Sequence, residues 1–163
     1  MPVSDRVVTN PAKMAENWRV AMTALMNLFL TTHRTMTEAS PVGPTELLIY
    51  VTVSVANVQK LMRERVIPEC YAATEILPRE WVVPISRNAI ATASGLPRET
   101  VRRRVAAMIA EGLLIEDPRG GVTVPIGVIK DLGLEPLLEA MLTDFARTAE
   151  TLLRIGVIEL KTD

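Results

Sequence analysis

The sequence predicts a mainly α-helical protein that carries one small β-hairpin. Three long segments have apolar residues at steps of three and four, as expected of helices that bury one face. In the middle of the chain, two short helical patterns are joined by a turn that contains glycine. A double glycine then separates two short runs rich in apolar residues, which is typical of a hairpin.

Composition limits what this chain can do. Its 163 residues are 48% hydrophobic and 4% aromatic, enough for one core or for one core with a helical extension. The net charge is −1, but the segment 86–110 holds five arginines and one acid, which leaves −5 for the remainder. This asymmetry indicates a small basic region on an acidic body. Neither a membrane span nor a signal peptide is recognisable, so we expect a cytoplasmic protein.

Residues 1–66 are expected to form two long helices. Asn10 is placed to cap the first, and Pro11 to occupy its first position. Its apolar stripe extends toward Met36, through Met14, Trp18, Ala21, Leu25 and Leu28. The second helix follows a break at 40–44. Its β-branched run is also compatible with a strand, but the three–four spacing lasts about twenty residues and favours a helix.

Residues 67–80 contain two prolines and no clear period, so we expect a connector with at most a short helix. Trp81–Val83 is predicted to be a short strand that pairs with the hairpin, and Pro84 ends it.

Residues 81–126 contain the two short helices and the hairpin. Ser86 can cap the helix over 87–93, and Gly95 can adopt the positive φ of the following turn. The next helix is predicted over 97–111, with Pro97 near its first turn. Its buried face would consist of Val101, Val105, Met108 and Ile109. The hairpin is predicted over 113–124, with its turn at 117–121.

A last long helix is predicted within 134–160. Its apolar seam is interrupted only by Thr148, and it comprises Leu134, Leu138, Met141, Phe145, Leu152 and Ile155. Together with residues 1–66, this helix would form either a core or a dimerisation body.

The sequence segments SGLPRETVRRRV and EGLL resemble the winged helix-turn-helix of bacterial transcriptional regulators. The local sequence is most similar to that of IclR-, GntR- and Crp-type domains, over about forty residues. The flanking helices resemble the MarR-type arrangement, in which terminal helices build a dimer. This resemblance implies sequence-specific binding of double-stranded DNA, with helix 97–111 in the major groove and hairpin 113–124 on the flanking groove or backbone. Arg104 departs from the small or apolar residue expected at its position.

Arginine suits this function because its planar fork can bond guanine O6 and N7 together, or grip a phosphate. Helical geometry places Arg103 opposite the buried face, with Arg102 and Arg104 on its flanks. The predicted DNA-binding residues are Ser86, Arg87, Arg98, Thr100, Arg102, Arg103, Arg104 and Arg119. Of these, Ser86 and Arg87 would contact phosphates, and Arg119 would act from the tip of the hairpin.

The sequence is compatible with two partners besides DNA, a second copy of the chain and a small effector. The long helices add more apolar surface than a DNA-binding domain alone requires, so we expect a twofold homodimer on a pseudo-palindromic operator, rather than one monomeric core. A small apolar effector could bind between Met22, Met26, Phe29 and Met62, although filling the core is the favoured role of these residues. A different function class is a protein-interaction module that scaffolds an assembly, which the overall acidity supports.

We expect no enzyme, cofactor or metal site. His33 is the only histidine and is interpreted as a surface residue, and one histidine and one cysteine are too few for zinc. No nucleophile motif or glycine-rich phosphate loop is recognisable. Cys70 is interpreted as a buried or half-buried thiol, with redox sensing as the alternative.

Overall fold

The computed structural model describes residues 5–64, 66–72, 76–127 and 135–162. It is mainly helical, at 63% of the chain, and it contains small two-stranded antiparallel sheets. The chain forms two compact units. Unit 1 consists of residues 1–39 and 134–163, and unit 2 of residues 40–133. None of the described helices is long and apolar enough to cross a membrane.

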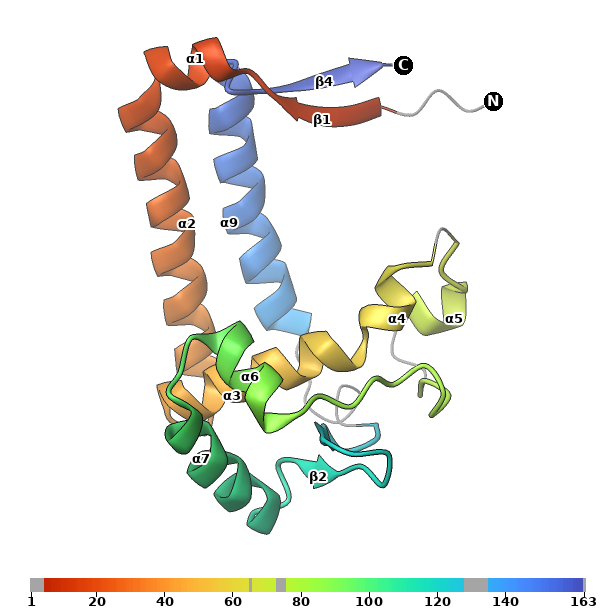
Figure 1. Cartoon of the computed structure of the whole chain (residues 1–163). Helices are drawn as coiled ribbons and strands as arrows, with labels where there is room; N and C mark the ends of the chain where they lie inside the picture. Colours follow the sequence, from red (N-terminus) through yellow and green to blue (C-terminus); the bar gives the residue numbers. More distant parts are fainter. Residues whose placement is uncertain (1–4, 65, 73–75, 128–134, 163) are drawn as a thin grey trace. The chain divides into compact units, whose positions relative to one another are not determined.

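Unit 1 contains a pair of long antiparallel helices and a β-ribbon (Figure 1). The ribbon joins the two ends of the chain and pairs Val7 with Leu160. Its elements are β1 (Asp5–Thr9), α1 (Pro11–Glu16), α2 (Trp18–Ala39), α9 (Glu135–Arg154) and β4 (Ile158–Thr162). The sequence predicted the long helices but not the ribbon, whose strands are separated by about 150 residues.

The cap of the first helix is confirmed, but its continuity is not. Asn10 Oδ1 accepts a hydrogen bond from the Lys13 amide at 3.1 Å. The helix predicted from Pro11 toward Met36 is interrupted at Asn17, which has φ −114° and ψ 21°. Its side chain donates to the carbonyl of Lys13 at 3.1 Å and satisfies an acceptor at the end of α1.

Unit 2 contains the central helices and the predicted hairpin. Its elements are α3 (Pro44–Asn57), α4 (Gln59–Met62), α5 (Glu69–Ala72), α6 (Arg87–Ser94), α7 (Arg98–Ala110), β2 (Ile115–Glu116) and β3 (Val122–Thr123). The ambiguous second segment is therefore helical, and it is interrupted at Val58, which separates α3 from α4. The short helix allowed within 67–80 is α5.

The largest core lies between α3, α6, α7 and the hairpin. Its buried members are Ile49, Val53, Ile90, Ala91, Val101, Val105, Met108, Leu114 and Val122. This list includes three of the four residues predicted for the buried face of α7, and Ile109 packs against it half-buried. α3, which the sequence grouped with residues 1–66, thus belongs to the core on which α7 rests.

The prediction of a strand at Trp81–Val83 is wrong. The Trp81 amide donates to the Pro78 carbonyl at 2.9 Å within a turn, and the Val83 amide donates to the Asn57 carbonyl at 3.0 Å. Pro84 has no amide to donate. Ile85 is therefore the first residue able to pair with the hairpin, and its amide bonds the Val122 carbonyl at 3.1 Å.

Several burial predictions are also wrong. Cys70 is exposed, because α5 is a single turn that buries none of its residues. The side chains interpreted as core fillers are exposed as well, namely Met22, Met26, Phe29 and Met62. The predicted seam of α9 is buried at Thr148 and Leu152 but exposed at Leu138 and Phe145. Leu134 lies outside the described residues.

Candidate nucleic-acid interface

The start of α6 and the turn after it follow the sequence-based expectation. Ser86 Oγ accepts a hydrogen bond from the Ala89 amide at 3.2 Å. Gly95 has a φ of 72°, a left-handed conformation that carries a steric penalty in residues with a Cβ. Pro97 occupies the N-cap of α7 with extended backbone. Ser86 and Gly95 thus mark the two ends of α6, and Pro97 marks the start of α7.

α7 turns one face to the core and another to solvent. Val101, Val105 and Met108 are buried. On the other side, Arg102 and Arg103 are exposed, as is Arg98 in the first turn. Thr100 is half-buried beside them. The exposed side of α7 therefore carries the charges that the sequence predicted for it.

A groove lies between the first turns of α6 and α7 and the hairpin. It is lined by Ser86, Arg87, Asn88, Arg98, Glu99, Arg102 and Gly121. Four of the eight predicted site residues thus meet in one place, from two helices joined by a tight turn. Asn88, Glu99 and Gly121 also line the groove but were not among the residues predicted from the sequence. The signal for Glu99 was its position three residues before Arg102, and the signal for Gly121 was the double glycine.

Neighbouring carboxylates offset the positive charge of two of the three arginines in this groove. Glu99 accepts two hydrogen bonds from Arg102, at 2.8 Å to Nε and 2.6 Å to Nη2. These bonds lower the pKa of Glu99 and raise the pKa of Arg102. Arg87 forms an ion pair with Glu116 on the hairpin. Neither Arg98 nor Arg103 makes a hydrogen bond or ion pair with any residue that the structure describes, although the charge of Arg103 contributes to lowering the pKa of Glu99. The N–H groups of both guanidinium groups are therefore available to donate to a ligand.

The remaining two predicted arginines are engaged elsewhere in unit 2. Arg104 Nη1 lies 2.8 Å from Glu46 Oε1 on α3, and its buried Nε has no hydrogen-bond partner in the described chain. The Arg119 guanidinium donates to Asp117 and to two backbone carbonyls, at 3.2 Å to Arg79 and 3.0 Å to Val82. Both side chains therefore have structural roles.

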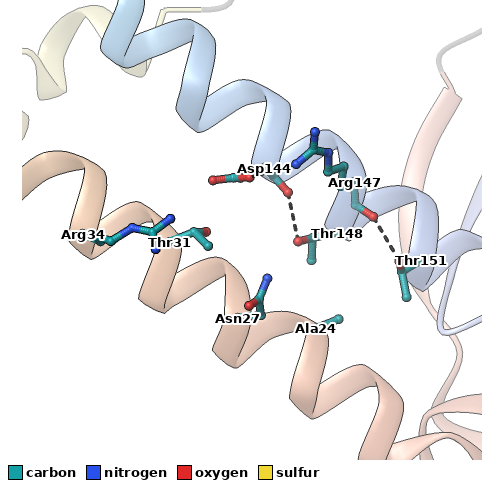
Figure 2. A pocket seen from close by; sticks show the side chains of 8 residues that line it. All are labelled: Ala24, Asn27, Thr31, Arg34, Asp144, Arg147, Thr148 and Thr151. Carbon is teal, nitrogen blue, oxygen red and sulfur yellow. Dashed lines mark hydrogen bonds and ion pairs between the residues drawn. The ribbon is translucent and has the colours of Figure 1, made fainter.

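Unit 1 carries a second groove, between α2 and α9 (Figure 2). It is lined by Ala24, Asn27, Thr31, Arg34, Asp144, Arg147, Thr148 and Thr151. Asp144 Oδ1 and Arg147 Nη1 lie 3.7 Å apart. The hydroxyl groups of Thr148 and Thr151 donate to backbone carbonyls of their own helix. This groove is polar, and none of the residues considered for an apolar effector lines it.

Comparison of the chain with family models, with curated proteins and with solved structures finds no match.

Proposed function

We propose that this protein is a transcriptional regulator that binds double-stranded DNA in a sequence-specific manner. In this proposal, α6, α7 and the β2–β3 hairpin act as a winged helix-turn-helix. α7 enters the major groove, and the hairpin lies on the flanking groove or the backbone. The observation that carries the proposal is the groove in which Ser86, Arg87, Arg98 and Arg102 meet.

The charges in and beside this groove suit a polyanion. Arg98 and Arg103 make no hydrogen bond or ion pair with the described residues, and both lie on the exposed side of α7. The major groove of B-DNA is wide enough for a helix, and arginine is the residue that most often reads guanine there. We therefore assign base or phosphate contacts to Arg98 and Arg103. Ser86 and Asn88 would contact phosphate from the start of α6.

The proposal includes a cytoplasmic protein that acts as a homodimer. One domain reads only a few base pairs, so two related half-sites one helical turn apart give the specificity that a regulator requires. Two copies of α7 related by a twofold axis would bind such a pseudo-palindromic site.

A second candidate function is a protein-interaction module. The pairing of Arg102 with Glu99, and of Arg87 with Glu116, favours it because these acids offset the positive charge of the groove. A partner with mixed charges could exchange its own ion pairs with these four side chains.

Fluorescence anisotropy tests the proposal. The labelled DNA is the genomic segment just upstream of the gene, compared with a scrambled segment at two salt concentrations. We expect tighter binding to the genomic segment and a steep loss of affinity with salt, because phosphate contacts release counterions. Equal and weak binding to both segments would favour the protein-interaction module.

Single substitutions locate the contacts. Truncating a base-reading arginine should cost about 1–3 kcal/mol and relax specificity at one position, whereas truncating a phosphate-binding arginine weakens all sequences alike. Arg98→Ala, Arg102→Ala and Arg103→Ala are compared with Arg147→Ala, an exposed arginine of unit 1. The docking of α7 is wrong if all four variants behave alike.

A further inference from the structure

Unit 1 leaves large apolar side chains uncovered. On α2 these are Trp18, Met22, Leu25 and Phe29, which are 39–68% exposed. On α9 they are Leu138, Leu142 and Phe145, which are 56–59% exposed. The residues follow the four–three spacing of a stripe that faces another helix. We refer to these seven side chains as the apolar face.

Helical geometry places both stripes on the same side of the helix pair. At about 100° per residue, each stripe lies about a quarter turn beyond the surface by which its helix contacts the other. The contact surface contains Ala21 on α2 and Leu152 on α9, which are buried together. α2 and α9 run antiparallel (Figure 1), and each stripe is offset from the contact surface of its helix by about the same angle in the direction of the helical turn. The two stripes therefore lie on the same side of the helix pair.

The other side of the same helix pair carries a groove that is lined mainly by polar side chains. Asn27, Thr31 and Arg34 on α2 and Arg147 on α9 lie there and line the groove of Figure 2. The helix pair is therefore a layer whose apolar face lies on the side opposite the polar groove. A layer of this kind is stable only when a second layer covers its apolar side.

Unit 1 does not supply that second layer from its own described residues. Its buried core consists only of Ala21, Leu152 and Val157, whereas the core of unit 2 has nine buried residues. The β-ribbon lies at one end of the helices (Figure 1). In its cross-strand pair Val7–Leu160, each residue is 63% exposed. A two-stranded ribbon is marginally stable without further packing.

We infer that a second copy of this chain covers the apolar face, so that α2 and α9 of two copies form a four-helix bundle. The face carries no charged side chain among its seven members, so two identical faces can meet without unpaired charges. A large side chain has roughly 150–250 Å² of surface, so the exposed fractions of these seven side chains leave about 600–800 Å² uncovered on one copy. A standard stable interface buries about 800 Å² of accessible surface on each partner, so the apolar face accounts for most of the area that a stable dimer needs.

This inference names the surface of the dimer in the proposed function, but it does not depend on DNA binding. α7 belongs to unit 2 and contributes none of the seven side chains of the apolar face. The mass in solution is measured without DNA, so failure of the bundle and failure of DNA binding are separate results.

Analytical ultracentrifugation of the full chain tests the inference, from about 1 to about 100 μM. The expected mass is twice the 17.9 kDa of one chain. Leu25→Asp and Leu142→Asp each place a charge on the apolar face, and we expect at least a hundredfold weaker dimerisation. Thr23→Asp and Thr143→Asp place the same charge on exposed positions of the same helices outside the apolar face, and they should leave the dimer intact.

The milder variants Leu25→Ala and Leu142→Ala protect the test against misfolding, which circular dichroism monitors in all variants. They should fold and should dimerise more weakly than the wild type. Thermal unfolding gives a second measure, since the midpoint of a dimer rises with protein concentration. A monomeric wild type at 100 μM, or a dimer that tolerates the aspartates at both Leu25 and Leu142, would overturn the inference.

Discussion

The side-chain oxygen of Asn57 accepts a hydrogen bond from the amide of Val124 at 2.9 Å, across 67 residues of sequence. The Asn57 amide group donates in turn to the Val83 carbonyl at 2.8 Å. Asn57 is only 2% exposed, so its side chain joins the end of α3 to the segments on both sides of α6, α7 and the hairpin. One polar residue thus holds together the frame that carries the candidate interface.

Replacing Asn57 by Ala should lower the free energy of unfolding by about 2–4 kcal/mol, because two buried backbone groups lose their partners. Asn57→Asp keeps the acceptor for Val124 but loses the donor to Val83, so it should also destabilise. Urea unfolding followed by circular dichroism measures both effects. Gln59→Ala, at an exposed position two residues later, should change stability little and serves as the control.

The two glycines of the hairpin turn should respond differently to substitution. Gly120 and Gly121 have φ values of 94° and 88°. A Cβ on Gly120 would meet open space, whereas a Cβ on Gly121 would lie 2.7 Å from the Ile85 carbonyl oxygen. Gly120→Ala should therefore cost only the backbone strain, about 1–2 kcal/mol.

Gly121→Ala adds a clash with backbone, and we expect a loss of about 3 kcal/mol or more. Thermal unfolding of the two variants side by side gives the comparison. Equal destabilisation would show that Ile85 does not approach the hairpin as closely as described.

Arg103 and Arg104 are neighbours with opposite expected phenotypes. Arg104→Ala breaks the half-buried pair with Glu46 and should lower the free energy of unfolding by about 1–2 kcal/mol. Arg103→Ala removes an exposed side chain and should leave stability unchanged within about 0.5 kcal/mol. In DNA titrations, Arg103→Ala should reduce the salt dependence by about one counterion, and Arg104→Ala should not. A pair of variants with the reverse pattern would contradict the orientation of α7.

Acid should weaken the attachment of the hairpin. Hydrogen bonds from the Arg119 side chain and backbone hold the pKa of Asp117 far below its usual value near 4. A carboxyl whose pKa is lowered by folding contributes stability above its unfolded pKa and loses that contribution as the pH falls toward the folded pKa.

Wild type should therefore exceed Asp117→Asn in stability at pH 6, and the difference should shrink steadily as the pH falls below about 4. Denaturant unfolding at a series of pH values measures the difference. Glu80→Gln, which alters an exposed carboxyl outside this contact, provides the control. A difference that is constant from pH 6 to the acid limit would show that the contact with Arg119 does not lower the pKa of Asp117.

The parts of the structure that the sequence predicted correctly are those set by local chemistry. Asn10 and Ser86 cap the helices that follow them, and Gly95 takes the positive φ that its turn requires. The exposed arginines of α7 followed from the helical period alone. These features depend on residues within one or two turns of each other, so a single sequence is enough to identify them.

The errors arise where distant residues decide the outcome. The β1–β4 ribbon depends on pairing between the two ends of the chain, and the loss of the strand at Trp81–Val83 depends on Asn57. Arg104 and Arg119 have the same residue type as Arg103, and only their contacts across the fold distinguish them. The exposed apolar stripes were predicted as stripes, but periodicity alone does not say which of them the monomer buries.

The order of the two units along the chain has a consequence for synthesis on the ribosome. Unit 2 is one continuous stretch, residues 40–133, whereas unit 1 combines residues 1–39 with residues 134–163. Because synthesis proceeds from the N-terminus, at about 5–20 residues per second, the last residue of unit 2 is added before any residue of α9. Unit 2, which carries the arginines of α7, can therefore fold first, while the apolar stripe of α2 remains exposed on the nascent chain.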